Sequence, residues 1–256
     1  MRRYLSVAGG LARRLLDVFI SSPALFLPPL LMPLFFFVAF AGGLSAITEA
    51  PGFDYPGGYT AFEFGFVLLQ AAAFGGVFTG FSIAADFQFG FGRRLLLATP
   101  HRSALILGYW VVAVVRAAVT LAVVTAVALA AGMNVGGSAG ELAAMYLLAG
   151  IVNAAGTLFA SGVALRYRSL QATPLMMVPT FLLLFLAPVY VPRDLLAGWV
   201  GAVSPFDPIT HVMEAGRNLL AGQPADLVGA LAIALGLAAA LALFAVRGLR
   251  KAEAAG

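Results

Sequence analysis

Six long stretches of this chain are almost free of charged side chains, and no other feature limits its fold as strongly. A helix needs about 20 apolar residues to cross the hydrocarbon core of a membrane. Only 10% of the residues are charged and 62% are hydrophobic, whereas soluble domains average about 25% charged residues. We therefore predict an all-α integral membrane protein in which residues 1–256 form a single transmembrane domain. Its six predicted transmembrane helices lie at roughly 23–47, 60–85, 104–131, 141–165, 173–191 and 225–246.

This composition excludes several classes of function. A soluble enzyme, a nucleic-acid-binding module and a disordered chain all need far more polar surface. The chain has 0 cysteines, so it forms neither a disulfide nor a thiolate metal site. Its 2 histidines fall in different compartments of the predicted topology, and no Gly-x-x-x-x-Gly-Lys phosphate loop is present. We expect no catalytic residue, no metal and no cofactor in this chain, so energy for uphill transport must come from another chain.

Charged residues sort to opposite sides of the predicted spans. Twelve of the 15 basic residues fall on one side, namely Arg2, Arg3, Arg13, Arg14, Arg93, Arg94, Arg102, Arg166, Arg168, Arg247, Arg250 and Lys251. Eight of the 11 acidic residues fall on the other, namely Glu49, Asp54, Glu63, Glu141, Asp194, Asp207, Glu214 and Asp226. Basic residues mark cytoplasmic loops. We therefore predict a multi-pass protein of the cytoplasmic (inner) cell membrane with both termini in the cytoplasm. The cytoplasmic loops account for the excess of basic residues, so we expect no nucleic-acid partner.

Residues 4–21 have the pattern of an amphipathic helix that lies in the membrane interface. Charged residues interrupt the apolar core that a signal peptide would need, and Arg13 precedes Asp17 by four residues, the spacing of a helical ion pair. A simple cytoplasmic anchor ahead of the first span is the alternative. The apolar residues near helical spacing are Leu5, Ala8, Ala12, Leu15, Leu16 and Phe19.

The cytoplasmic loop 86–103 is too long and too patterned to be a connector. Asp86 can cap the start of a helix and Pro100 can end one. Leu95, Leu96 and Leu97 would give that helix an apolar side outside the membrane, which needs a partner surface or the membrane interface. We predict a helix that docks on a cytosolic subunit; an interfacial helix with its basic residues on lipid phosphates is the alternative. The docking set is Asp86, Arg93, Arg94, Leu95, Leu96, Leu97, Thr99, Pro100 and Arg102.

The external segment 192–224 contains two apolar pieces that are too short to span. Residues 195–203 cover about 14 Å as a helix, under half the thickness of the core. Asp207 at the N-cap and Pro208 after it would start a second helix, on whose polar face Glu214 and Arg217 can pair. We predict a re-entrant hairpin that acts as an external gate; an amphipathic pair lying on the surface is the alternative. The gate set is Trp199, Pro205, Asp207, Pro208, Glu214 and Arg217.

Arg116 is the charged residue that we place inside a predicted span, where a guanidinium is costly. Either it faces a cavity or a subunit interface and meets an anionic head group, or it snorkels from a span that extends into the cytoplasm. Gln70 and Asn153 join it as candidate cavity residues, although hydrogen bonds between helices would also explain them. The pairs at 75–76 and 42–43 are glycines, which favour close helix packing.

Together these motifs resemble a known family. After Asp86, residues 92–103 read Gly-Arg-Arg-Leu-Leu-Leu-Ala-Thr-Pro-His-Arg-Ser, similar to the coupling-helix loop of type-2 ABC transporter permeases of the daunorubicin-resistance exporter type. The stretch Ser-Pro-Phe-Asp-Pro at 204–208, with Glu214 and Arg217 after it, resembles the family's segment before the last span, although Asp207 stands where asparagine is usual. With the amphipathic N-terminal helix and six spans, the resemblance covers the whole chain.

The resemblance implies the membrane-spanning permease of an ABC exporter. It implies a second permease subunit, identical or homologous, and two copies of a separate ATPase that binds ATP and Mg²⁺. The cargo would be a hydrophobic or amphipathic drug, natural product, lipid or glycolipid; an exporter of polysaccharide or glycolipid precursors is the alternative. Two classes outside the family fit less well. A purely structural membrane protein would not need an apolar docking side on a cytoplasmic helix. A secondary transporter would carry ionisable groups at mid-membrane, and this chain has almost none there.

Overall fold

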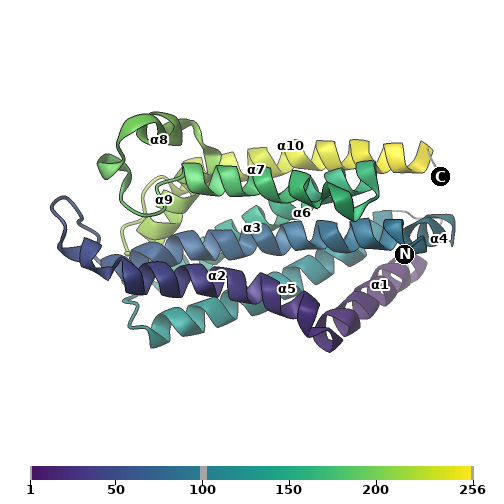
Figure 1. The fold of residues 1–256 in the computed structure, drawn as a ribbon, viewed down its shortest axis with the longest axis horizontal. Coiled ribbons are helices and arrows are strands. Elements are labelled where there is room, and N and C mark those ends of the chain that lie inside the picture. Colours follow the sequence, from purple (N-terminus) through teal and green to yellow (C-terminus); the bar gives the residue numbers. More distant parts are fainter. Residues whose placement is uncertain (1, 99–102, 255–256) are drawn as a thin grey trace.

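The computed structural model describes residues 2–98 and 103–254, and all regular secondary structure in these residues is helical (Figure 1). This confirms the predicted all-α fold. The helices are α1 (Arg2–Ser21), α2 (Pro23–Gly43), α3 (Gly58–Gln88), α4 (Phe91–Ala98), α5 (Ser103–Ala130), α6 (Ala139–Tyr167), α7 (Thr173–Leu186), α8 (Gly198–Val203), α9 (Pro208–Leu220) and α10 (Leu227–Ala254). Short 3-10 turns lie at Ser45–Glu49, Leu170–Ala172, Arg193–Leu195 and Ser204–Phe206.

Four helices in the described residues, α3, α5, α6 and α10, are long and apolar enough to cross a membrane. Two further apolar stretches, Leu27–Gly43 in α2 and Leu170–Leu186 at α7, are shorter. Prolines interrupt both helices, which neighbouring helices in a membrane tolerate. The chain is thus a helical membrane protein, while the count of six spans stays a prediction in which α2 and α7 are the short members.

Helix α3 is the centre of the fold and is buried along nearly its whole length. It packs against α2, α5 and α6. A Cβ atom on Gly76 would lie 2.5 Å from the Asn153 carbonyl oxygen, so α3 and α6 meet backbone to backbone. Close packing is therefore confirmed for the 75–76 pair. It is wrong for Gly42 and Gly43, because a Cβ atom added to either would meet no other part of the described chain within 4 Å.

Helix α1 is amphipathic and begins two residues earlier than the predicted stretch. Its apolar side, from Ala8 to Phe19, is buried against the first half of α5. On its opposite side, Arg13 and Asp17 are exposed and lie 4.0 Å apart. This two-sided burial is what an interfacial helix requires, and its position at a membrane surface stays a prediction.

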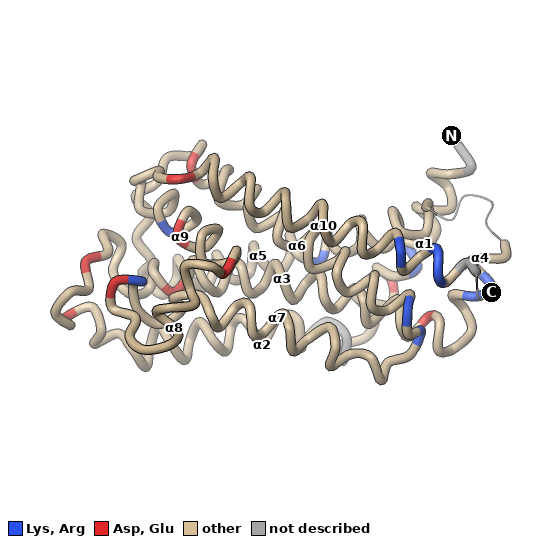
Figure 2. Tube along the Cα trace, turned by 90° about the horizontal axis from the view of Figure 1, so that it is seen from above, with Lys and Arg blue, Asp and Glu red and all other residues tan. Residues whose placement is uncertain are grey.

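Charge is divided between the two ends of the molecule (Figure 2). Basic residues gather at the end that holds α1, α4 and the last turns of α10, while most acidic residues lie at the opposite end near α8 and α9. The sorting predicted from the sequence is thus present in space. Basic residues mark the cytoplasmic side of membrane proteins, so the predicted cytoplasmic side corresponds to the end with α4.

Candidate functional site

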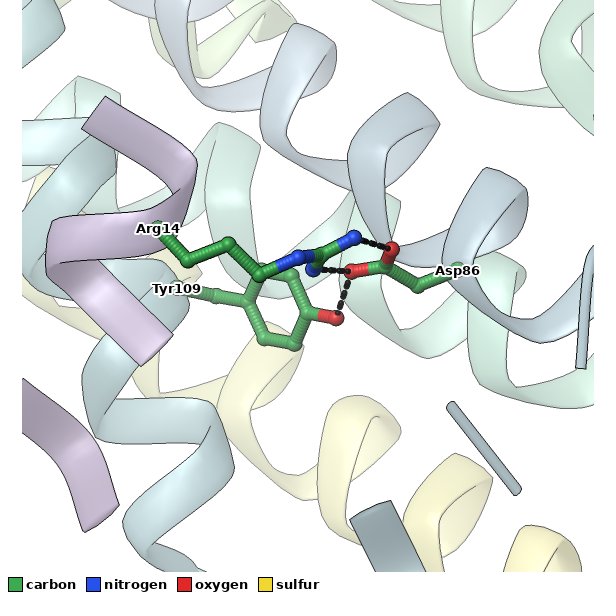
Figure 3. Close-up of polar contacts among 3 residues, drawn as sticks. All are labelled: Arg14, Asp86 and Tyr109. Atoms are coloured by element: carbon green, nitrogen blue, oxygen red, sulfur yellow. Dashed lines mark hydrogen bonds and ion pairs between the residues drawn. The ribbon is translucent and has the colours of Figure 1, made fainter. Parts of the chain in front are cut away.

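Asp86 ties three helices together at the basic end of the molecule (Figure 3). The Arg14 guanidinium donates to both of its carboxylate oxygens, at 3.2 and 3.0 Å, and the Tyr109 hydroxyl donates to one at 2.6 Å. Arg14 also lies 3.8 Å from the centre of the Phe91 ring at the start of α4. The expectation that Asp86 caps a helix is wrong, because α3 runs on to Gln88 and Asp86 lies inside its last turn.

Helix α4 presents only part of the expected docking face. Leu96 is 8% exposed and packs into the core, Leu95 is half-buried, and Leu97 is 74% exposed. Successive residues of a helix are about 100° apart, so three in a row do not share one face, and the single apolar docking side is wrong. Arg93 and Arg94 are exposed beside Leu97. Thr99, Pro100 and Arg102 lie outside the described residues.

The start of α9 has the predicted capping chemistry. The Asp207 carboxylate accepts from the Ile209 and Thr210 backbone N–H groups at 3.3 and 3.0 Å, and Pro208 is the first helical residue. Burial raises the pKa of Asp207 above its usual value, and these hydrogen bonds offset only part of that rise. A ring nitrogen of His211 lies 2.9 Å from the Pro205 carbonyl oxygen. These contacts fix the bend between the two external pieces.

Helix α8 and the turn after it carry large apolar side chains that no other part of the described chain covers. Trp199 is 69% exposed and Phe206 is 85% exposed. Trp199 lies in α8 and Phe206 ends the 3-10 turn that follows it. Helix α8 stands clear of the long helices in Figure 1. Exposed aromatic side chains of this kind are typical of a surface that meets lipid or another subunit.

Arg217 is buried rather than on an exposed polar face, with 3% of its surface exposed. Its guanidinium donates to three backbone carbonyls, of Phe62 at 2.9 Å, Pro188 at 2.6 Å and Val189 at 3.1 Å. The last two carbonyls follow the end of α7, where the helix no longer supplies donors. The predicted pair with Glu214 is wrong, because that carboxylate instead lies 3.8 Å from the Arg193 guanidinium.

Glu63 is a functional candidate that the sequence analysis missed. It was counted among the external acidic residues, yet it lies in α3, fully buried, and neither carboxylate oxygen has a hydrogen-bond partner among the described residues. Arg217 is the positive charge that acts on it. Its position three residues inside the window 60–85 was the available indication. Glu63 follows Phe62, whose carbonyl accepts from Arg217, but no ion pair joins the two charged side chains among the described residues.

The three candidate cavity residues do not come together. Arg116, 7% exposed, lines a cavity of about 430 Å³ between α1, α3 and α5 and donates to Thr79 Oγ1 at 3.1 Å. Asn153 donates to the Ala72 carbonyl at 2.9 Å and borders a different cavity of about 620 Å³ between α5 and α6. The side-chain amide of Gln70 is buried, has no hydrogen-bond partner among the described residues and lines neither cavity. Of the three, only Arg116 brings charge to a cavity.

A third cavity is almost wholly apolar and lies beneath α9. It measures about 170 Å³ and is bounded by α6, α7, α9 and α10. Leu184, Val212 and Leu237 are among its lining residues. Such a space suits an apolar group and offers no chemistry. In the described residues no three His, Cys, Asp or Glu side chains are placed to hold a metal ion.

Fold and site together define a helical membrane protein in which the polar residues described above form hydrogen bonds between helices. Residues 9–221 match the family model described as ABC-2 type transporter. The chain is 26% identical over 224 residues to the daunorubicin resistance ABC transporter permease protein DrrB1 of Streptomyces coeruleorubidus, an alignment that covers 86% of this chain and 76% of the relative. This chain belongs to the ABC-2 type transporter family, which confirms the resemblance seen in its motifs. It is a membrane permease, and such permeases are non-catalytic partners of ATPases.

Proposed function

We propose that this chain is the permease subunit of an ATP-driven exporter that moves a hydrophobic or amphipathic molecule out of the cytoplasm. The observation that carries the proposal is α4, a short helix at the basic end of the molecule with Leu97, Arg93 and Arg94 exposed. An apolar side chain flanked by basic ones, outside the long apolar helices, fits a docking surface for a cytosolic subunit.

The docking helix is mechanically joined to the transmembrane helices. Only Phe89 and Gly90 separate α3 from α4, and the Arg14–Asp86–Tyr109 contacts hold α1, α3 and α5 together at this point. A push on α4 would therefore reach α3 directly. Helix α3 has 31 residues, a length of about 46 Å at 1.5 Å per residue, and its far end meets Arg217. Movement started at the ATPase would thus arrive at the external segment 192–224.

We further propose that residues 192–224 form the external gate as a re-entrant hairpin. In support, residues of α9 line the apolar cavity, and Arg217 of α9 donates hydrogen bonds to α3 and to the segment after α7. A shift of α3 relative to α7 would loosen these hydrogen bonds. The gate would then open by moving α9 away from the cavity.

The partners and cargo of the exporter follow from the family. We propose a second permease, identical or homologous, and two copies of an ATPase that carries ATP and Mg²⁺, in the cytoplasmic membrane with both termini of this chain inside. The relative named for daunorubicin resistance and the apolar cavity support a small hydrophobic or amphipathic cargo. Lipids, glycolipids and polysaccharide precursors are the competing cargo classes.

Copurification with an ATPase subunit and cargo-stimulated ATP hydrolysis in proteoliposomes test the proposal. Leu97→Asp should release the ATPase and abolish stimulation while membrane insertion is unchanged. Tyr167→Asp is the matched control, because Tyr167 is 59% exposed at the same end of the molecule but lies outside α4. If Leu97→Asp retains the ATPase and transports normally, α4 is not the docking surface.

A further inference from the structure

The cavity between α1, α3 and α5 carries an uncompensated positive charge. Among the described residues, ion pairs join Arg14 to Asp86 but none joins Arg116 to a carboxylate. One Arg116 nitrogen donates to Thr79, yet the buried Nε has no hydrogen-bond partner. A buried guanidinium without an anion is costly. The cavity therefore has the electrostatics of an anion site that is complete only when a ligand is present.

The walls of this cavity are apolar apart from the charges. Phe19 from α1 and Phe78 and Phe81 from α3 line it, and the Arg116 guanidinium carbon lies 5.3 Å from the centre of the Phe19 ring. A volume of about 430 Å³ exceeds what one inorganic anion needs, since a water molecule takes roughly 30 Å³. Arg14 and Asp86 also line the cavity, but they are paired with each other. The unpaired charge of Arg116 and the aromatic surface around it suit an amphipathic anion.

The depth of Arg116 matches that of lipid phosphates. Its partner Thr79 stands 21 residues from Gly58 at the start of α3, about 31 Å along the helix and so about the thickness of the hydrocarbon core. Independently, Arg116 lies beside Phe19, near the end of α1, and α2 enters the apolar region two residues after α1 stops. Both measures place the guanidinium at the inner boundary of the hydrocarbon core.

We propose that this cavity binds the phosphate of an anionic amphipathic lipid from the cytoplasmic leaflet, with the Arg116 Nη groups as donors and the phenylalanine rings against its acyl chain. The inference goes beyond the export function and depends on the membrane position of α1. A guanidinium pairs with phosphate through charge-assisted hydrogen bonds, and the Nη groups at the tip of Arg116 are the donors that can reach the cavity. The lipid is either a resident component of the permease or its cargo.

Native mass spectrometry of the delipidated, detergent-solubilised full chain tests the site, with phosphatidylglycerol and diacylglycerol of the same acyl chains as probes. We expect phosphatidylglycerol to bind and diacylglycerol not to bind. Arg116→Gln should weaken phosphatidylglycerol binding by at least about tenfold, since a charge-assisted hydrogen bond is worth more than one factor of ten. Arg116→Lys should bind with intermediate affinity, because it keeps the charge but loses the paired donors.

Two further variants separate the cavity from general charge. Arg250→Gln removes an exposed basic residue in the last turns of α10 and should leave binding unchanged. Ala85→Leu fills the cavity from α3 while keeping the guanidinium, and should also weaken binding in protein that elutes as a single folded species. Equal phosphatidylglycerol affinity in wild type, Arg116→Gln and Ala85→Leu would overturn the proposal.

The source of the ligand is resolved by two additional measurements. Inorganic phosphate that binds the wild type as tightly as phosphatidylglycerol does would overturn the lipid assignment, because the acyl chain would then contribute nothing. In proteoliposomes containing the ATPase, ATP-driven movement of labelled phosphatidylglycerol to the other leaflet supports the site and identifies the lipid as cargo. Binding without movement supports the site and identifies a resident lipid. Since binding is measured without the ATPase, its failure is distinct from a failure of the export proposal.

Discussion

Replacing Arg217 should be among the most damaging single changes in the chain. Arg217→Met keeps most of the side-chain volume but removes three hydrogen bonds, to the carbonyls of Phe62, Pro188 and Val189. It also leaves the buried Glu63 carboxyl without its nearby positive charge. Each buried acceptor that loses its donor typically costs about 1–3 kcal/mol, so the loss of three hydrogen bonds amounts to several kcal/mol. We expect a loss of this size in the free energy of unfolding.

A double-mutant cycle with Glu63→Gln gives this prediction its test. If Arg217 balances Glu63, the double variant should recover at least about 1 kcal/mol relative to the sum of the single changes, which is within the range measured for groups in contact. The assay is denaturant unfolding of purified protein in one detergent, with export measured in parallel. Strict additivity would refute the coupling between Glu63 and Arg217. A loss below about 1 kcal/mol for Arg217→Met would refute the stabilising role of its three hydrogen bonds.

Three further predictions concern other parts of the molecule. Asp86→Asn should lower the free energy of unfolding by about 1–3 kcal/mol and reduce ATPase stimulation. Tyr109→Phe removes only one hydrogen bond and should lower it by about 1 kcal/mol. An intact ATPase response in Asp86→Asn would contradict the coupling role. Gly76→Ala should destabilise by about 1–3 kcal/mol, because its Cβ would meet the α6 backbone, and wild-type unfolding would disprove that contact. Burial raises the pKa of Glu214 more than Arg193 lowers it. The folded protein thus holds this proton more tightly than the unfolded chain, so stability is higher in acid and falls as pH rises through the folded pKa; thermal unfolding of Glu214→Gln should lose this part of the pH dependence, and an unchanged profile would contradict it.

Local chemistry was predictable from the sequence, and long-range partners were not. The capping of α9 by Asp207 depends on residues two and three positions away, so composition and spacing sufficed. Asp86 failed as a predicted cap because its partner Arg14 is 72 residues distant, and no spacing rule reports that contact. Asp207 and Asp86 are both acidic residues near a helix end, so each could either cap a helix or pair with a distant side chain.

The errors at α4 and α9 have a different cause, because both concern which side of a helix faces the core. Three consecutive leucines indicate an apolar helix but not its rotation, which packing against α3 decides by burying Leu96 and exposing Leu97. Arg217 looked like a solvent-facing residue, yet carbonyls left open after α7 provide acceptors inside the fold. Glu63 was missed since a buried acid close to a window edge reads as a loop residue.

The carbonyls that Arg217 satisfies impose an order on biosynthesis. Pro188 and Val189 receive these hydrogen bonds from a residue 29 and 28 positions later in the chain. When the ribosome has just completed α7, its outer end has no such donor, and open carbonyls in lipid are costly. In the predicted topology, we therefore expect α7 to settle only after α9 has been synthesised and has reached the outer side. We expect nascent chains that stop short of position 217 to retain α7 in the insertion machinery, and longer chains to release it, with α10 joining the bundle last.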